Sequence, residues 1–320
     1  VERALEASVA AREGWRGRGP EERGRILAAV AVELAKDRGE AIATMVLDAG
    51  KAVTEGDVEV SEAIDFANYY ARSLLDGGWW DGSGFEPLGT VVVTPPWNFP
   101  FAIPCGSVLA PLAAGNTVIL KPAPETVLTA WVMVRALWRA GVPRDVLQFV
   151  PCPDDEVGRA LVTDRRVGAV VLTGAYETAR MFLGWKPEMR LFAETSGKNA
   201  LIVTAAADPD LAVKDLVRSA FGHAGQKCSA ASLGIIEAER YDDPGFLRQL
   251  EDAARSLATG PSWDFGSVVT PLIREPGEAL HRALTSLEPG EEWLLEPRMI
   301  DGNPRLWSPG IRLGVRPDGW

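Results

Sequence analysis

Cysteine and histidine are scarce in this chain of 320 residues, which contains three cysteines and two histidines. An odd and sparse cysteine count excludes a disulfide framework and is typical of proteins from a reducing compartment. Cys105, Cys152 and Cys228 also lie too far apart in the sequence to match the spacing of zinc ligands. We therefore expect a cytoplasmic protein without disulfide bonds and without a metal site.

The chain also lacks an excess of positive charge and a long apolar run. Its 33 Lys and Arg residues stand against 44 Asp and Glu residues, so the formal net charge is −11. That balance provides no electrostatic footprint for nucleic acid or for an anionic membrane. The longest nearly apolar stretch, residues 101–115, is short for a membrane span and is interrupted by Pro104 and Pro111. The charged first residues do not resemble a signal peptide. We expect neither nucleic acid nor a membrane as a partner.

Hydrophobic residues make up 47% of the chain, and their spacing changes near residue 84. Residues 1–76 carry apolar side chains at one-turn spacing, which predicts helices, and a Gly/Trp/Asp loop is expected over 76–84. From residue 88 onward, short strands rich in Val and Leu alternate with helices. This alternation predicts an α/β fold with a parallel sheet that is covered on both faces. The expected strands are 88–96, 116–122, 146–151, 167–174 and 189–197.

A second α/β region begins near residue 197. Two further strands are expected at 199–204 and 228–238, and a helix between them has Asp208 or Asp210 as its candidate N-cap. The length of the chain is sufficient for about two domains. We therefore place a domain boundary at residues 193/194.

The glycine-rich turn G-x-G-x-x-G, which marks most dinucleotide-binding folds, is absent. Two weaker signals remain. The strand 167–174 ends at Gly174 and Ala175 and leads into a helix, whose first backbone N–H groups could receive a phosphate. The strand 116–122 ends near Lys121, whose ammonium could donate to ribose or phosphate oxygens. Each pattern also occurs in α/β proteins that bind no nucleotide.

A polar side chain follows the first expected strand of the sheet. Pro96, Trp97 and Asn98 stand between that strand and the next helix. In open α/β sheets, ligands bind at the loops that follow the carboxyl ends of the strands. The Asn98 amide could donate to a developing oxyanion without titrating. Alternatively, Asn98 caps the helix that follows.

Two further residues are candidates for chemistry. Glu194 comes at the end of an apolar strand, where burial tends to raise the pKa of a carboxyl group and suits it to general-base catalysis; the alternative is an ion pair with Lys198. Cys228 follows a Gly- and Gln-containing turn. A partly exposed thiol there would be a candidate nucleophile, whereas a buried thiol would only fill space. His223 is close in sequence, but we interpret it as structural.

Taken in order, these segments form one pattern. The motifs PWNFP (96–100), LKPA (120–123), LTG (172–174), ETSGKN (194–199) and GQKCS (225–229) closely resemble those of the aldehyde dehydrogenase superfamily. The resemblance extends over roughly the whole chain. The wording AETSGKNALIV and FGHAGQKCSAAS is most similar to the L-glutamate γ-semialdehyde (1-pyrroline-5-carboxylate) dehydrogenase branch, and especially to the dehydrogenase half of bifunctional proline-utilisation enzymes.

The resemblance implies a role for each candidate residue. Cys228, as a thiolate, would attack an aldehyde. The Asn98 amide and the backbone N–H of Cys228 would hold the resulting oxyanion, and Glu194 would activate the water that releases a carboxylic acid. The substrate implied for this branch is glutamate γ-semialdehyde, which is oxidised to glutamate in proline catabolism.

The same resemblance implies NAD as the cofactor, with NADP as the alternative, since this family binds a dinucleotide without the usual glycine-rich turn. Lys121 would face the adenosine ribose. Gly174, with Ala175 after it, would lie at the helix that meets the pyrophosphate, and Pro96 and Trp97 would line the cofactor site. The expected domains are then an NAD(P)-binding domain over residues 1–193 and a catalytic domain over 194–320.

Three positions depart from the family pattern. Pro124, followed by Glu125, stands where the family often has the Glu that chelates the ribose diol, which leaves the choice between NAD and NADP open. Ala175 stands where Ser is common, so one phosphate contact is missing or replaced. Thr195 and Ser196 replace the usual Leu-Gly.

Family members are considerably longer, and their downstream Glu-x-Phe motif has no match here. We therefore expect an internal fragment of a longer parent enzyme, incomplete at both ends and weakly active or inactive by itself. The parent is expected to be a homo-oligomer, and fusion to a proline dehydrogenase domain is one arrangement. Alternatives are another branch, such as a succinate-semialdehyde dehydrogenase, or a nucleotide-binding module without turnover. Glu194 argues against an acyl-phosphate-forming relative.

Overall fold

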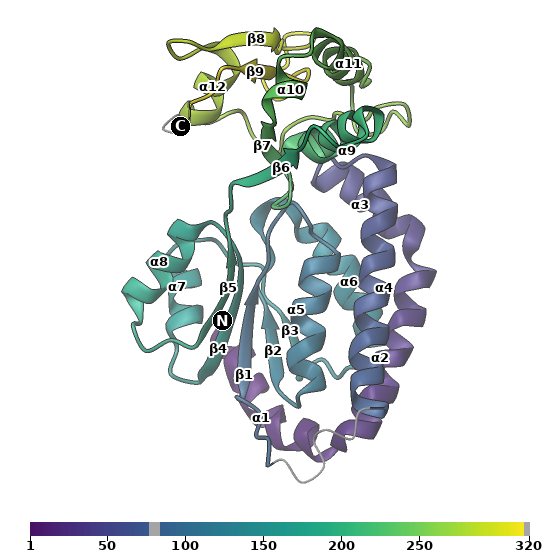
Figure 1. Ribbon diagram of the computed structural model, residues 1–320. Helices are drawn as coiled ribbons and strands as arrows, with labels where there is room; N and C mark the ends of the chain where they lie inside the picture. The colour runs from purple at the N-terminus through teal and green to yellow at the C-terminus, as the bar shows by residue number, and fades with distance from the viewer. Residues whose placement is uncertain (77–83, 317–320) are drawn as a thin grey trace. The chain divides into compact units, whose positions relative to one another are not determined.

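The computed structural model describes residues 1–76 and 84–316 (Figure 1). Most of the expected loop 76–84 lies outside these residues. The chain forms two compact units: Val1–Ala49 with Gly56–Ser196, and Gly50–Glu55 with Gly197–Trp320. The assignment of these units to cofactor binding and catalysis stays a prediction. The short segment 50–55, which comes from the helical N-terminal region, groups with the second unit.

The first unit is built on one parallel sheet, as predicted. Its five strands are β1 (Thr90–Thr94), β2 (Thr117–Leu120), β3 (Leu147–Phe149), β4 (Val167–Gly174) and β5 (Leu191–Thr195), in the order β3-β2-β1-β4-β5. Every neighbouring pair is parallel. The predicted α/β fold class is therefore confirmed, and each of the five expected strands contains or coincides with an observed one.

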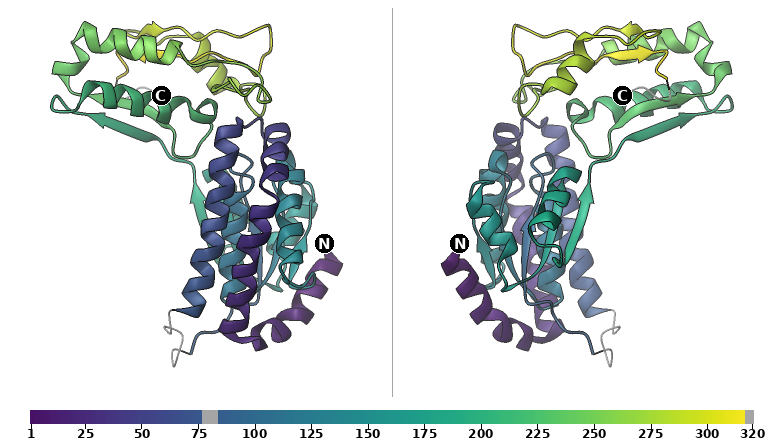
Figure 2. Two further views of the ribbon diagram at one scale, coloured as in Figure 1. Left: turned by 90° about the vertical axis from the view of Figure 1, so that its right-hand side faces the viewer. Right: turned by 90° about the vertical axis from the view of Figure 1, so that its left-hand side faces the viewer.

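Helices cover both faces of this sheet (Figures 1 and 2). They are α1 (Glu2–Gly17), α2 (Gly19–Lys36), α3 (Arg38–Asp48), α4 (Val53–Leu75), α5 (Ala102–Ala113), η1 (Pro124–Thr126), α6 (Val127–Arg139), α7 (Glu156–Thr163) and α8 (Tyr176–Trp185). Alternation along β1 shows how the two layers form. Val91 and Val93 belong to the core shared with α2–α6, whereas Val92 points to the opposite core, which contains Leu161 of α7 and Phe182 of α8.

The strand order contains a reversal. From β1 the chain proceeds through β2 to β3 on one side, and it then returns to place β4 on the other side of β1. The helix after β1, α5, packs against β1 and β2 in one core, and the helix after β4, α8, packs against β4 and β5 in the other. A doubly wound sheet binds ligands at such a switch point, beyond the carboxyl ends of the two strands that flank it.

The second unit contains two small sheets. Its elements are β6 (Asn199–Val203), α9 (Pro209–Phe221), η2 (Gly222–Gly225), β7 (Ala231–Ile236), α10 (Ala238–Tyr241), α11 (Pro244–Arg255), α12 (Glu278–Thr285), β8 (Glu292–Leu295) and β9 (Ile311–Leu313). Strands β6 and β7 pair in parallel, and β8 and β9 pair antiparallel. Of the two candidate N-caps, Asp208 caps α9, because its side chain accepts from the Leu211 N–H at 2.9 Å. Among the described residues, no helix combines the length and the apolar character needed to cross a membrane.

A β-bulge in the first sheet depends on Gly168. The pairing of β1 with β4 shifts by one residue between Thr90 and Val91, so Gly168 has no partner on β1. A Cβ atom at this position would lie 1.9 Å from the backbone oxygen of Leu88. That overlap is with backbone and cannot be relieved by rotating a side chain.

We expect Gly168→Ala to lower the free energy of unfolding by about 3 kcal/mol or more, because the backbone of Leu88 or of β4 must move. Gly174→Ala is the matched control on the same strand. Its Cβ would lie 3.5 Å from Leu172 Cδ1, an ordinary contact, and we expect a change below about 1 kcal/mol. Urea unfolding followed by circular dichroism measures both values, and similar losses for the two variants would contradict this explanation.

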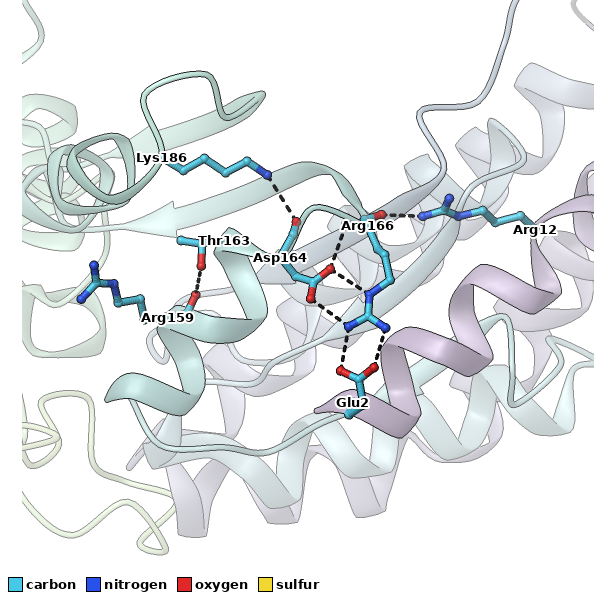
Figure 3. Close-up of polar contacts among 7 residues, drawn as sticks. All are labelled: Glu2, Arg12, Arg159, Thr163, Asp164, Arg166 and Lys186. Carbon is cyan, nitrogen blue, oxygen red and sulfur yellow. Dashed lines mark hydrogen bonds and ion pairs between the residues drawn. The ribbon is translucent and has the colours of Figure 1, made fainter.

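An ion-pair network ties α1 to the turn before β4 (Figure 3). The Arg166 guanidinium donates to both oxygens of Glu2 at 2.7 Å, and to Asp164 at 2.8 and 2.9 Å. Arg12 of α1 donates to the backbone oxygen of Arg166 and to Thr90 Oγ1 at 2.8 Å. Lys186 donates to the backbone oxygen of Asp164 at 3.3 Å. The network thus joins α1, β1 and α8 around one turn.

This network predicts a pH dependence of stability. Hydrogen bonds from Arg166 lower the pKa of Asp164 and of Glu2. A carboxyl group with a lowered folded-state pKa stabilises the fold above its unfolded pKa, which is about 4, and loses this contribution as the pH falls through the folded value. We expect Arg166→Gln to lower the melting temperature by a few degrees at pH 7, and the difference to vanish in acid. Arg3→Gln, a change at an exposed arginine beside Glu2, is the control; a pH-independent deficit in Arg166→Gln would refute the assignment.

Candidate functional site

Within the first unit, the parallel strands end at one common edge of the sheet (Figure 1). Four predicted site residues belong to these strand ends: Asn98 follows β1, Lys121 follows β2, Gly174 ends β4 and Glu194 is the penultimate residue of β5. The register aligns these ends, because the Lys121 N–H donates to the Val93 oxygen at 2.9 Å, and Gly174 pairs with Thr195. All four residues therefore lie at the carboxyl ends of the strands, next to the switch point between β1 and β4.

The loop after β1 is anchored by a residue that the sequence analysis did not identify. Pro96, Trp97 and Asn98 are half-buried in this loop. The buried carboxylate of Glu59, from α4, accepts from the backbone N–H of Phe101 at 2.8 Å and of Ala102 at 3.1 Å. Glu59 thus accepts from the first backbone N–H groups of α5, and the role of Asn98 stays a prediction.

Lys121 is nearly buried and has an acidic partner. Its side chain is 8% exposed, and its ammonium forms an ion pair with Asp154, whose side chain is 66% exposed. Asp154 belongs to the loop that connects β3 to α7. Lys121 alternates with Leu120, so it lies on the same sheet face as Ile119, which packs with α7 and α8. The ammonium is therefore held at the end of β2 on that face.

The N-terminus of α8 meets the turn after β5. Ala175 is the N-cap residue of α8 and has an extended backbone. The Tyr176 N–H donates to Ser196 Oγ at 3.3 Å. The Ser196 hydroxyl, from the residue after β5, thus lies at this helix end.

Glu194 departs from one expectation. The sequence analysis placed it at a buried strand end, but Glu194 is exposed, as are Phe192 and Ala193. The physical reason is that β5 is an edge strand of the five-stranded sheet, with β4 as its one neighbour. The role of Glu194 as a base therefore rests on its position at the carboxyl edge, and stays a prediction.

Cys228 lies in the second unit, between η2 and β7, and its thiol is free and exposed. The segment is held by Asn199 of β6, whose amide donates to the backbone oxygen of Cys228 and to that of Ala230 at 3.3 Å. The thiol therefore stands on a backbone that is fixed against the β6–β7 pair. This exposure favours the nucleophile interpretation over the packing one.

The turn before Cys228 has an unusual backbone. His223 and Ala224 both have left-handed conformations, with φ of 53° and 54°, and Gly225 continues at 72°. A left-handed conformation is costly for a residue with a Cβ. His223 is fully buried, and burial, followed by the charges of Lys51 and Lys227, lowers its pKa well below the usual value. The imidazole is therefore neutral near pH 7, consistent with a structural role.

Lys227 is not available to stabilise a thiolate at Cys228. Its ammonium forms an ion pair with Glu55 at 2.6 Å, and Glu55 belongs to the segment 50–55 of the same unit. The ion pair joins that short segment to the residue before Cys228. Among the described residues, no group of three or more His, Cys, Asp or Glu side chains is arranged to hold a metal ion.

The three thiols differ enough for their reactivities to be predicted. Cys228 is exposed, Cys152 is half-buried and Cys105 is fully buried. Burial raises the pKa of Cys105 strongly and that of Cys152 to a lesser degree. Since the thiolate is the reactive form, we expect iodoacetamide to modify Cys228 at least about tenfold faster than Cys152, and Cys105 only after unfolding. Peptide mass spectrometry over time measures this order; equal rates at Cys228 and Cys152 would contradict it.

Four residues that shape these positions were not identified as site residues from the sequence: Glu59, Asp154, Ser196 and Asn199. Ser196 and Asn199 fall within the motif ETSGKN, so that motif was a usable signal. Glu59 and Asp154 act on partners more than 30 positions away in the chain. No local pattern marks such contacts, because they depend on how the strands and helices pack.

A hollow of about 490 Å³ occurs elsewhere on the first unit, at the junction of α6 and the loop that leads to β3. It therefore lies at the amino ends of the strands, opposite the edge described above. Three arginines line it, but Arg135 pairs with Glu40 at 2.6 Å, Arg139 pairs with Asp37, and Arg144 stacks on a Trp ring. We assign it no function.

Known proteins are similar in sequence to this chain. The profile of the Aldehyde dehydrogenase family matches residues 1–288. The 1-pyrroline-5-carboxylate dehydrogenase of Staphylococcus haemolyticus is 40% identical in an alignment of 282 positions, which covers 82% of this chain and 54% of that protein. The 1-pyrroline-5-carboxylate dehydrogenase 2 of Bacillus subtilis is 38% identical in an alignment of 320 positions, which covers 94% of this chain and 61% of that protein. The chain thus spans little more than half the length of these curated relatives.

Solved structures share the fold. Proline utilization A (PutA) from Corynebacterium freiburgense is 50% identical, with a TM-score of 0.90 over 94% of this chain and 31% of that chain. A 1-pyrroline-5-carboxylate dehydrogenase from Thermus with bound NAD is 33% identical, with a TM-score of 0.87 over 97% of this chain and 63% of that one. Together with the family profile, these matches confirm the resemblance seen in the sequence motifs, and the chain belongs to the aldehyde dehydrogenase family.

Proposed function

We propose that this chain carries the cofactor-binding and nucleophile-bearing parts of a dehydrogenase that oxidises L-glutamate γ-semialdehyde to L-glutamate with NAD. The observation that carries this proposal is the placement of Asn98, Lys121, Gly174 and Glu194 at the carboxyl ends of adjacent strands, beside a switch point. Membership of the aldehyde dehydrogenase family supplies the reaction class.

The residues at this edge fit a dinucleotide. Lys121 offers a nearly buried ammonium at the end of β2, where doubly wound folds place the adenosine ribose. The N-terminus of α8 offers backbone N–H groups to the pyrophosphate, and Gly174 leaves space for its approach. Pro96 and Trp97 lie after β1, the other strand at the switch point. The structural relative from Thermus was solved with bound NAD, which supports the same cofactor here.

Three side chains then divide the chemistry. The Cys228 thiolate attacks the aldehyde carbon, a C–S bond forms, and the carbonyl electrons move onto oxygen. The Asn98 amide and the Cys228 backbone N–H donate to that oxyanion. NAD, when bound, would accept the hydride that leaves this carbon as the C=O bond re-forms. A thioester would then be left on Cys228. Asn98 suits its role because an amide donor does not titrate.

Glu194 completes the reaction. Its carboxylate takes a proton from water as the water attacks the thioester carbon. The C–S bond breaks, the Cys228 thiolate leaves, and the carboxylic acid is released. An exposed carboxylate at the edge of the sheet has access to solvent water, as this role requires. We propose that each of these three groups contributes to the same reaction in the parent enzyme.

The names of the relatives guide the remaining proposals. Two curated relatives are 1-pyrroline-5-carboxylate dehydrogenases, which favours glutamate semialdehyde over other aldehydes. One structural neighbour is described as bifunctional proline utilization A, so we propose fusion to a proline dehydrogenase domain as one arrangement of the parent, which we also propose is a homo-oligomer. Three free cysteines support a cytoplasmic location.

A substrate comparison tests the proposed function. The parent enzyme is assayed for NAD reduction with glutamate semialdehyde, succinate semialdehyde and propionaldehyde. We expect kcat/KM to favour glutamate semialdehyde by about a hundredfold or more, because a site that pairs with charged substrate groups rejects analogues that lack them. A preference for either other aldehyde would assign the protein to another branch of the family. The absence of aldehyde-dependent reduction would support a binding module without turnover.

A further inference from the structure

The ion pair between Lys121 and Asp154 has a consequence for cofactor choice. We propose that Asp154 makes the adenosine-ribose site select a 2′-hydroxyl over a 2′-phosphate, and thus NAD over NADP. This inference rests on the proposed cofactor site. Asp154 lies outside the motifs that carry the family resemblance. Its charge bears on the choice between NAD and NADP, which Pro124 leaves open.

The pair lies at the end of β2, the second strand along the chain. In doubly wound folds the residue at the end of the second strand reaches the adenosine ribose, and it is usually acidic in NAD enzymes, whereas a basic residue nearby accommodates the phosphate of NADP. Here that residue is Lys121, which taken alone would favour NADP. The acidic group comes instead from Asp154, in the loop after β3, the strand next to β2.

Separating Lys121 from Asp154 would cost free energy, because the ammonium is nearly buried. The Lys121 side chain is 8% exposed, and a Cβ at Gly158 of α7 would lie 3.4 Å from Lys121 Cε. The lysine stem therefore passes directly over the start of α7. The same Cβ would lie 2.8 Å from the Pro153 backbone oxygen, so Gly158 also lets the loop that carries Asp154 pack closely on α7. A buried ammonium that lost its carboxylate would be left uncompensated.

The pair offers a ligand one hydrogen-bond donor, the Lys121 ammonium, and one acceptor, the Asp154 carboxylate. A 2′-hydroxyl is both donor and acceptor, so it can donate to the Asp154 carboxylate and accept from the Lys121 ammonium. A 2′-phosphate is an acceptor with negative charge, and it would face the Asp154 carboxylate. That carboxylate is 66% exposed and therefore accessible to a ligand, while its charge already offsets the charge of Lys121.

The surrounding charges act in the same direction. Asp155 and Glu156 follow Asp154 directly and are exposed. The Asp155 side chain caps α7, since its carboxylate accepts from the Val157 N–H at 2.8 Å. Arg159, one turn into α7, lies 3.7 Å from Glu156 and over the ring of Trp185. The loop thus presents negative charge, which opposes a 2′-phosphate.

Calorimetric titration of the full chain with NAD and with NADP tests the inference without relying on turnover. We expect the wild type to bind NAD more tightly, and Asp154→Asn to lower the ratio of the two affinities by about tenfold or more, chiefly by tightening NADP. Asp154→Ser is a second variant that removes the same charge. Glu156→Gln, which removes a charge two residues away, is the control and should leave the ratio within about twofold.

The outcomes separate the inference from the proposed function. If the wild type binds NAD and Asp154→Asn leaves the ratio unchanged, Asp154 is not the selecting group and the inference is wrong. If Glu156→Gln changes the ratio as much as Asp154→Asn, general charge rather than the ion pair is responsible, which also overturns it. If the wild type binds neither nucleotide, the proposed cofactor site is wrong, and the inference falls with it.

Discussion

Replacing Cys228 by alanine is expected to lower kcat/KM for aldehyde oxidation in the parent enzyme by at least about 10⁴-fold, because the proposed covalent intermediate forms on its thiolate. The affinity for NAD should remain within about twofold, since the proposed cofactor contacts come from Lys121 and Gly174 of the first unit, whereas Cys228 belongs to the second. Steady-state kinetics and calorimetric titration of the same preparation measure the two quantities.

Cys152→Ala is the matched control for this variant. Cys152 is also free and partly accessible, but it lies after β3 and has no proposed role in the reaction. Its replacement should leave kcat within about threefold of the wild type. Retained oxidation in Cys228→Ala would refute the nucleophile assignment. Loss of activity together with loss of NAD binding would indicate a folding defect instead.

Replacing Glu194 by glutamine is expected to separate the two halves of the reaction. Thiol attack and hydride removal do not need the carboxylate, whereas release of the acid does. We expect a rapid burst of reduced NAD that approaches one equivalent per active site, followed by turnover slowed by about 10²–10⁴-fold. Stopped-flow absorbance measures the size of the burst and the later rate.

Glu188→Gln provides the control, in the turn between α8 and β5. Glu188 is exposed just before β5, at the amino end, whereas Glu194 lies near the carboxyl end. Removing a charge at the amino end should change neither phase. If Glu194→Gln abolishes the burst, Glu194 acts before thioester formation, and the proposed division of labour is wrong. A normal steady-state rate in this variant would exclude Glu194 as the base.

The sheet and its edge could be predicted from the sequence because they depend on local patterns. Runs of Val and Leu in β1 and β4, separated by helical segments, already indicate buried parallel strands. Parallel strands share one carboxyl edge, so residues that follow them, such as Asn98 and Lys121, are brought together by topology alone. That is why the motifs were informative although no glycine-rich turn is present.

Burial and pairing were harder to predict, because they depend on which elements become neighbours. Glu194 ends an apolar strand and was expected to be buried. The strand order, however, places β5 at the edge, where Glu194 is exposed. The Asp154 partner of Lys121 comes from a loop 33 residues further along the chain. The ion pair between Glu55 and Lys227, within the second unit, likewise joins residues far apart in the chain, and no local pattern indicates it.

A covalent acyl group on Cys228 is the most direct test of the proposed reaction. Parent enzyme carrying Glu194→Gln is mixed with NAD and glutamate semialdehyde, quenched in acid within the burst, digested, and its cysteine peptides are weighed by mass spectrometry. The proposal predicts the mass of a glutamyl thioester on the peptide that contains Cys228, and on no other cysteine peptide. Reduced NAD formed without that adduct, or an adduct at Cys105 or Cys152 instead, would contradict it.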